Sequence, residues 1–135
     1  MIFFALKMVD YTLLIYMVGD NDLSHYCRLN TQACIQGMLK SETPVNLVIY
    51  EDSKVSGVKG TPVLFQLKRN YQIKEKVDTI MIKQYDTEMN SADPEVLQQV
   101  ANEAFEKVPS AIRGIEIWSH GLGWVPGSSY RPSSY

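Results

Sequence analysis

Three mostly apolar segments, residues 11–18, 45–50 and 112–118, have the composition of buried β-strands. Residues 11–18 (Tyr-Thr-Leu-Leu-Ile-Tyr-Met-Val) form a continuous run of β-branched, aromatic and leucine side chains, and residues 45–50 form a shorter one. Continuous apolar runs of this length are typical of strands covered on both faces in a parallel sheet. We therefore expect these segments to lie side by side in the core.

Two stretches between these strands show the three-and-four spacing of amphipathic helices. The first follows Asn21 or Asp22, either of which can cap it, and ends before Pro44. The second begins at Asp93-Pro94, a capping residue followed by proline at the first helical position. The predicted buried positions are Leu23, Tyr26, Cys27, Asn30, Cys34 and Met38 in the first helix and Leu97, Val100, Ala101, Ala104, Phe105 and Val108 in the second.

The stretch between the second strand and the second helix predicts a β-hairpin. Residues 63–67 alternate as a strand, and their partner is either residues 71–74 or residues 79–84. The element order is then strand, helix, strand, hairpin, helix, strand. This alternation predicts an α/β fold in which the three long strands are parallel and adjacent, with the helices flanking the sheet.

Length and charge exclude several classes of protein. The chain has 135 residues, about one domain, and 45% of them are hydrophobic and 21% charged, as in ordinary globular proteins. A net charge of −2 provides no basic surface for nucleic acid or anionic lipid. No apolar run approaches the ~18 residues of a membrane span. The apolar start lacks the basic region of a signal peptide, so no signal peptide is visible.

The strongest candidate for chemistry is His120, which follows the third strand and precedes Gly121. An imidazole changes charge near neutral pH, and a glycine lets a substrate carbonyl approach its N–H. The acidic residues Asp20 and Asp22 follow the first strand, and Asp52 follows the second. Ligands of open α/β sheets bind beyond the carboxyl ends of the strands. The second histidine, His25, is expected on the surface.

The two cysteines are predicted to be structural. Cys27 and Cys34 lie seven positions apart in one predicted helix, which separates them by about two turns, or ~10 Å. That separation is too long for a disulfide, so both are expected to be buried free thiols. Neither is assigned as a nucleophile, and no residue is assigned as a metal ligand.

Three short motifs resemble one known family. They are Gly19-Asp20-Asn21-Asp22-Leu23, Met89-Asn90-Ser91-Ala92-Asp93-Pro94-Glu95-Val96-Leu97 and Trp118-Ser119-His120-Gly121-Leu122-Gly123-Trp124. In this order and spacing they resemble the clostripain-like cysteine peptidases. The resemblance implies a caspase-like α/β/α sandwich with a largely parallel central sheet and an inserted β-hairpin. It places an N-terminal extension at residues 1–10, the peptidase part at 11–125, and an exposed linker or remnant of a processing loop at 126–135.

The resemblance also implies a function. Such peptidases cleave after Arg or Lys with a Cys-His dyad; His120 would be the catalytic histidine and Gly121 an oxyanion donor. Asp20, Asn21, Asp22 and Trp118 would contact the substrate. The family's cysteine lies further along the chain, so this sequence corresponds to an autoprocessed light chain whose partner is a cysteine-bearing heavy chain. The resemblance further implies peptide or protein substrates, an extracellular or periplasmic location, and Ca²⁺ as an allowed cofactor.

Two other functions stay open at this stage. A receiver-like phosphoacceptor domain would use Asp52 with the acidic residues after the first strand to hold Mg²⁺. It would leave the tryptophan-flanked His120 without a role. A non-catalytic interaction subunit or pseudoenzyme would lack the nucleophile altogether.

Overall fold

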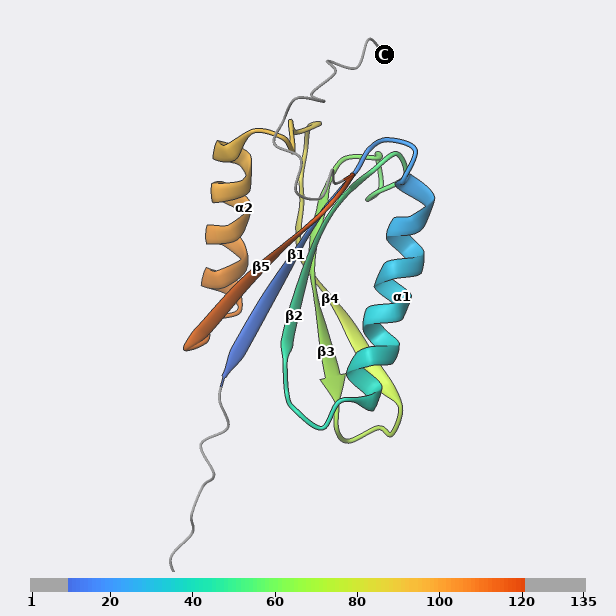
Figure 1. Cartoon of the computed structure of the whole chain (residues 1–135), viewed down its shortest axis with the longest axis vertical. Helices are drawn as coiled ribbons and strands as arrows, with labels where there is room; N and C mark the ends of the chain where they lie inside the picture. Colours follow the sequence, from blue (N-terminus) through green and yellow to red (C-terminus); the bar gives the residue numbers. More distant parts are fainter. Residues whose placement is uncertain (1–9, 121–135) are drawn as a thin grey trace, which may run out of the picture.

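The computed structural model describes residues 10–120, and the predictions made for residues 1–9 and 121–135 lie outside it. Five strands and two helices make up this part of the chain (Figure 1). In chain order they are β1 (Tyr11–Gly19), α1 (Ser24–Lys40), β2 (Asn46–Ser53), β3 (Val63–Asn70), β4 (Lys76–Gln84), α2 (Pro94–Lys107) and β5 (Ile112–Trp118). The predicted order of elements is confirmed.

All five strands join one sheet in the order β4-β3-β2-β1-β5. The three long strands are parallel and adjacent, as predicted, because β1 pairs with β2 on one side and with β5 on the other. The pairs β2–β3 and β3–β4 are antiparallel. The prediction of a largely parallel sheet was therefore wrong in degree: the hairpin extends the central sheet itself, and half of the pairings are antiparallel.

The hairpin uses the more distant of the two predicted partners. β3 pairs with β4, which begins at Lys76, and residues 71–75 form the turn. Glu75 has a φ of 62°, so this turn closes through a left-handed residue. Asn70 stabilises its start, because the Asn70 side-chain oxygen accepts hydrogen bonds from the N–H groups of Gln72 and Ile73. A longer turn leaves the nearer segment, residues 71–74, out of the sheet.

The helices cover opposite faces of the sheet (Figure 1). Alternate residues of β1 therefore enter two separate cores. The core under α2 contains Leu14, Tyr16, Val48, Tyr50, Leu64, Tyr85, Val100, Ala104 and Val108. The core under α1 contains Ile15, Met17, Cys27, Leu47, Ile49, Val63, Phe65 and Leu67. The central strands are buried on both faces, which explains their uninterrupted apolar sequence.

The two helices begin in different ways. α2 begins as predicted: Asp93 caps it by accepting a hydrogen bond from the Glu95 N–H at 2.9 Å, and Pro94 follows. For α1 the predicted cap was wrong, since Leu23 occupies the capping position and no side chain caps the helix. Asn21 instead accepts a hydrogen bond from the Leu23 N–H at 2.8 Å. Its side chain therefore shapes the loop that precedes the helix.

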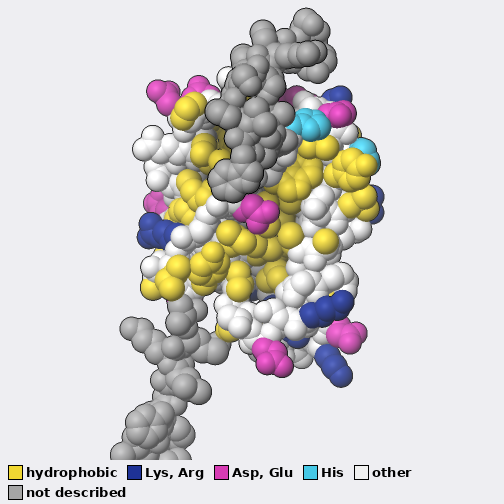
Figure 2. All heavy atoms as spheres, viewed as in Figure 1, with side chains coloured by type: hydrophobic (Ala, Val, Ile, Leu, Met, Phe, Trp, Pro, Cys, Tyr) yellow, Lys and Arg dark blue, Asp and Glu magenta, His cyan; other side chains and the backbone are white. Residues whose placement is uncertain are grey.

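β5 is an edge strand of the described sheet, and most of its side chains are exposed. Ile115 and Ile117 expose 47% and 63% of their surface, although they lie in a strand with an apolar pattern. Figure 2 views the molecule from the side of this strand and shows hydrophobic side chains gathered across the middle of that face. The free edge of such a strand presents backbone N–H and C=O groups with which a further strand can pair.

Candidate active site

His120 lies two residues beyond the end of β5 and contacts the loop after β1. Its Nε2 is 2.6 Å from Oδ1 of Asp22. The two residues are 98 positions apart in sequence, and the parallel pairing of β1 with β5 brings their loops to the same edge of the sheet. Both side chains are exposed, His120 by 59% and Asp22 by 80%. The imidazole therefore faces solvent and is free to meet a substrate.

The contact with His120 affects the charge of Asp22. The hydrogen bond from the imidazole lowers the pKa of Asp22, and the charge of His120 acts in the same direction. The carboxylate therefore stays ionised and accepts a hydrogen bond from the Nε2–H group. In the neutral ring this tautomer leaves Nδ1 with the lone pair that can take up another proton.

The loop between β1 and α1 carries three of the predicted site residues. Asp20 and Asp22 are exposed, and Asn21 is half-buried. Asn21 is held on both sides of its amide, because its nitrogen donates to the Val18 carbonyl at 3.3 Å and its oxygen accepts from Leu23. This arrangement fixes the backbone on which Asp22 stands. Asn21 is therefore a structural element of the loop, and a contact with substrate stays a prediction.

Trp118 lies at the end of β5, beside Gly19. Its ring is half-buried and packs against the core under α1. A Cβ at Gly19 would overlap the sulfur of Cys27 and come within 3.4 Å of the Trp118 ring, so only glycine fits there. Trp118 has a packing role at this end of the strand, and its predicted contact with substrate is untested. Gly121, the predicted oxyanion donor, lies outside the described residues.

The two cysteines do not form a reactive site. Both are free thiols, Cys27 fully buried and Cys34 half-buried. Burial raises the pKa of Cys27 to about 11, and burial also raises the pKa of Cys34. The thiolate is the nucleophilic form of cysteine. Because these environments suppress it, the residues described offer no candidate for a cysteine nucleophile.

One polar cluster near the site was only partly anticipated from sequence. Asp52 lies inside β2, not beyond it as predicted, and only 3% of its surface is exposed. Its side chain accepts a hydrogen bond from the Ser91 hydroxyl, which lies 2.8 Å from the hydroxyl of Tyr50. Asp52 also lies close to the carboxylates of Asp20 and Glu88. Sequence reasoning missed Glu88 because nothing in its local pattern distinguishes it from other loop glutamates.

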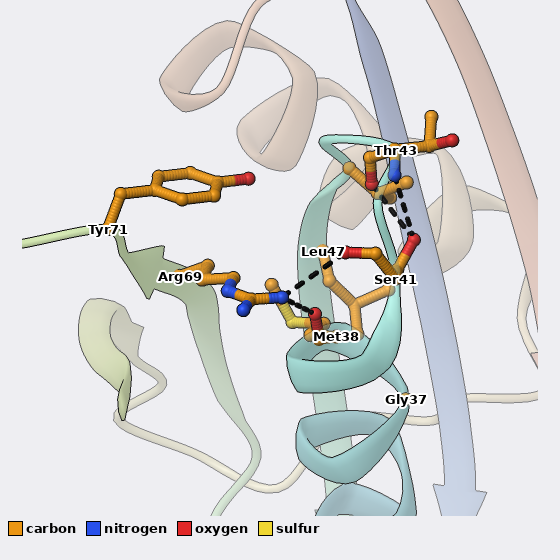
Figure 3. A pocket seen from close by; sticks show the side chains of 8 residues that line it. Gly37, Met38, Ser41, Thr43, Leu47, Arg69 and Tyr71 are labelled. Atoms are coloured by element: carbon orange, nitrogen blue, oxygen red, sulfur yellow. Dashed lines mark hydrogen bonds between the residues drawn. The ribbon is translucent and has the colours of Figure 1, made fainter. Parts of the chain in front are cut away.

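A separate small pocket lies at the opposite end of the strands (Figure 3). Its volume is about 170 Å³, and its walls come from the end of α1, the start of β2 and the end of β3. Arg69 reaches across it and donates hydrogen bonds to the carbonyls of Met38 at 2.7 Å and Ser41 at 3.2 Å. These bonds satisfy carbonyls at the end of a helix, so Arg69 has a structural role.

The fold and the strand-end histidine together define a caspase-like α/β domain. A profile described as the clostripain family matches residues 15–134. The chain belongs to this family of cysteine peptidases. Within the part that the structure describes, no helix has the length and apolar character needed to cross a membrane.

Solved structures of related proteins share this fold. A B. fragilis cysteine protease is 30% identical, with a TM-score of 0.73, and the match covers 90% of this chain and 98% of that one. An inactive zymogen of a C11 protease from Parabacteroides distasonis is 34% identical, with a TM-score of 0.76 and coverage of 90% and 33%. A secreted C11 cysteine protease from Bacteroides thetaiotaomicron, in complex with an irreversible peptide inhibitor, is 34% identical, with a TM-score of 0.70 and coverage of 93% and 33%.

The comparison with curated proteins gave no match. The chain spans about a third of the length of two of these solved relatives and nearly all of the third. Membership of the clostripain family replaces the receiver-like alternative, in which Asp52 would accept a phosphoryl group.

Proposed function

We propose that this chain is the histidine-bearing, N-terminal part of a secreted cysteine endopeptidase that cleaves after Arg or Lys. The observation that carries this proposal is His120, exposed at the carboxyl end of β5 and paired with Asp22. The cysteine nucleophile belongs to a further segment of the same precursor or to a second chain. By itself the present chain is inactive.

The proposed chemistry assigns distinct roles to the residues near His120. The imidazole takes the proton of the thiol and later donates a proton to the leaving amine. Asp22 holds the ring through Nε2 and stabilises the charged imidazolium, which directs Nδ1 towards the reacting groups. The Gly121 N–H and the N–H of the nucleophile receive the oxyanion, and loss of one such donor typically costs ~10²–10³ in rate.

The substrate would lie along the acidic loop after β1. Asp20 and Asp22 are exposed carboxylates in this loop, and they favour a peptide with a basic side chain at the cleavage site. Asn21 fixes the conformation of this loop. Trp118, at the end of β5, would form the opposite wall of the substrate site. We expect the carboxylate at the base of the specificity pocket to come from the cysteine-bearing segment.

The cysteine-bearing segment would dock on β5. A strand added beside β5 would satisfy its edge and cover Ile115 and Ile117, which are exposed in the present structure. It would also bring its carboxyl end next to His120, where a catalytic cysteine must stand. The 98% coverage of the B. fragilis relative's chain, against 33% of two others, supports a two-chain enzyme processed from a precursor.

An active-site label tests this function directly. The complete protein is treated with an irreversible peptide inhibitor that ends in Lys or Arg, and each chain is then weighed intact by mass spectrometry. We expect the label on a cysteine outside this sequence, with Cys27 and Cys34 unmodified because their thiolates are suppressed.

The same measurement addresses the pseudoenzyme alternative. A companion segment without a labelled cysteine, or a lone 15.3 kDa species with no cleavage activity, would favour the non-catalytic subunit. Labelling by an inhibitor that ends in an acidic residue, with none by Lys or Arg, would contradict the proposed specificity and leave the peptidase assignment intact.

A further inference from the structure

The small pocket at the end of the strands away from the candidate active site is lined mostly by apolar surface. Its lining includes Met38 near the end of α1, Val45 and Leu47 at the start of β2, and Arg69 and Tyr71 at the end of β3 and in the turn after it. Its volume of about 170 Å³ is close to that of an apolar cavity of ~150 Å³, which holds one benzene molecule. The pocket therefore has the size and the lining to take one aromatic side chain.

Arg69 and Tyr71 favour an aromatic ring as the occupant of this pocket. The guanidinium of Arg69 lies 5.5 Å from the centre of the Tyr71 ring, and its hydrogen bonds to the carbonyls of α1 and the loop after it hold it in place. A guanidinium attracts the face of an aromatic ring, and two aromatic rings attract each other edge to face. In Figure 3 both side chains extend towards Met38 and Ser41 on the other side of the pocket. A phenylalanine ring would therefore bind here better than an aliphatic side chain of the same size.

Gly37 keeps one wall of this pocket open. It lies within α1, where glycine is less favourable than alanine because it loses more conformational entropy when the helix forms. A Cβ at this position would meet no atom of the described residues within 4 Å outside its own stretch of helix. A larger residue would therefore fit at position 37, and the glycine leaves space beside α1 that the described residues do not fill.

The chain enters the described fold beside this pocket. Asp10 is the first described residue, and its side chain accepts a hydrogen bond from the Asn46 side chain at 3.3 Å. Asn46 stands between Val45 and Leu47, which line the pocket. Neighbouring strands are about 4.8 Å apart, and nine extended residues span up to ~30 Å. Residues 1–9 are therefore long enough to reach the pocket from the start of β1.

The composition of residues 1–9 matches the pocket. Their sequence is Met-Ile-Phe-Phe-Ala-Leu-Lys-Met-Val, in which Lys7 is the only charged residue, and burial of such apolar side chains is favourable. We infer that this segment folds back over the end of the strands and places Phe3 or Phe4 in the pocket. It would then tie the end of α1 to the β3–β4 hairpin, which Arg69 already joins. The inference is independent of the proposed peptidase function, because the pocket lies at the other end of the strands.

Substitution of both phenylalanines in the full 135-residue chain tests this inference. Phe3→Ser combined with Phe4→Ser removes the two rings and leaves the length of the segment unchanged. We expect the melting temperature, followed by circular dichroism, to fall by roughly 3–8 °C, because a buried aromatic ring is lost. NMR gives a local readout. The methyl signal of Met38, assigned by its loss in Met38→Leu, should shift when the ring packed against it is removed.

Two further variants show whether the effect arises in the pocket. Lys7→Ser changes the charged residue of the same segment and should leave the melting temperature and the Met38 signal as in the wild type. Gly37→Leu fills the pocket from α1, and it should fold because leucine favours helices more than glycine does. In this background the double phenylalanine substitution should no longer lower the melting temperature. Circular dichroism first establishes that each variant keeps the wild-type fold.

Four results would overturn the inference. The first is a folded double phenylalanine variant with the melting temperature and the Met38 signal of the wild type. The second is an equal loss of stability in Lys7→Ser, which would exclude a specific role of the rings. The third is an unchanged effect of the double substitution in Gly37→Leu, which would place the rings elsewhere. The fourth is an effect that disappears on dilution, which would assign the pocket to the segment of a second copy of the chain.

Discussion

At the residue scale, the contact between His120 and Asp22 depends on two loops that neighbouring parallel strands bring together. The imidazole is fixed through one nitrogen by a carboxylate that the contact itself keeps ionised. Both groups are exposed, so the pair is screened by water in the isolated chain. A second chain covering this edge would remove that water and strengthen the interaction.

The buried Cys27 gives a prediction about pH. Because burial raises its pKa to about 11, its thiolate fraction at neutral pH is roughly 100-fold below that of an ordinary cysteine. Iodoacetamide should modify Cys27 at least that much more slowly in the folded chain than in the unfolded chain at the same pH. The rate in the folded chain should rise about tenfold per pH unit until the pH approaches the pKa.

Peptide mapping by mass spectrometry follows this reaction site by site. In the complete enzyme, Cys27→Ser should leave kcat/KM for Arg and Lys peptides unchanged and at most lower the stability of the core. Rapid alkylation of Cys27 at neutral pH, or loss of turnover in a folded Cys27→Ser protein, would contradict its structural role.

Single residues also show what sequence reasoning could reach. The motifs around Asp22 and His120 selected both residues, but their direct contact depends on loop conformations that no periodicity encodes. Asp52 was expected beyond the second strand because the apolar run that predicts this strand ends at Tyr50. Its burial is possible because Ser91, which is 39 positions away in sequence, is also buried and donates a hydrogen bond to it. Such long-range compensation is invisible in a local pattern.

At the scale of elements, β5 combines an apolar sequence with an exposed position. Its pattern predicts a strand buried on both sides, and that prediction was wrong for the described chain, since Ile115 and Ile117 are exposed. This mismatch supports the proposal that a strand of the cysteine-bearing segment covers β5.

A charge on β5 tests this interpretation. Ile117→Asp should weaken assembly with the cysteine-bearing segment by at least about tenfold, because the pairing strand would bury an unpaired carboxylate. The fold of the chain itself should persist, since 63% of Ile117 is exposed. Assembly is measured by co-purification and analytical ultracentrifugation of the two co-expressed parts.

Val58→Asp is the matched control, because Val58 is 92% exposed and lies in the loop between β2 and β3. It should assemble as the wild type does. If Ile117→Asp assembles equally well, or if the isolated chain is a stable soluble monomer whose partner binds elsewhere, β5 is not the docking edge.

The hairpin marks the limit of element prediction. Its strands could be predicted from alternation, but the choice between two partners depended on the turn. In the structure β3 pairs with β4, because residues 71–75 form a longer turn in which Glu75 is left-handed. This turn has no glycine and no Asn-Gly pair, the usual sequence signals of a hairpin turn. Because the partner of β3 was uncertain, the sequence also did not predict that the hairpin would extend the central sheet.

At the scale of the whole molecule, the central β2-β1-β5 arrangement could be predicted because buried parallel strands and their helices leave strong sequence patterns. The elements that cover the free edge of β5 could not be predicted, because they would belong to segments outside this chain. The 33% coverage of two solved relatives places most of their length outside this chain. The boundaries at residues 10 and 125 and the linker at 126–135 stay predictions.

Replacement of His120 in the complete enzyme tests the central claim most directly. His120→Ala should lower kcat for Arg or Lys peptides by about 10²–10⁴, because it removes the group that is proposed to exchange protons with the thiol and the leaving amine. The fold should be unchanged, since 59% of the His120 side chain is exposed. His25→Ala removes the other histidine of the chain and should retain full activity. Full activity in folded His120→Ala, or an equal loss in His25→Ala, would contradict the account.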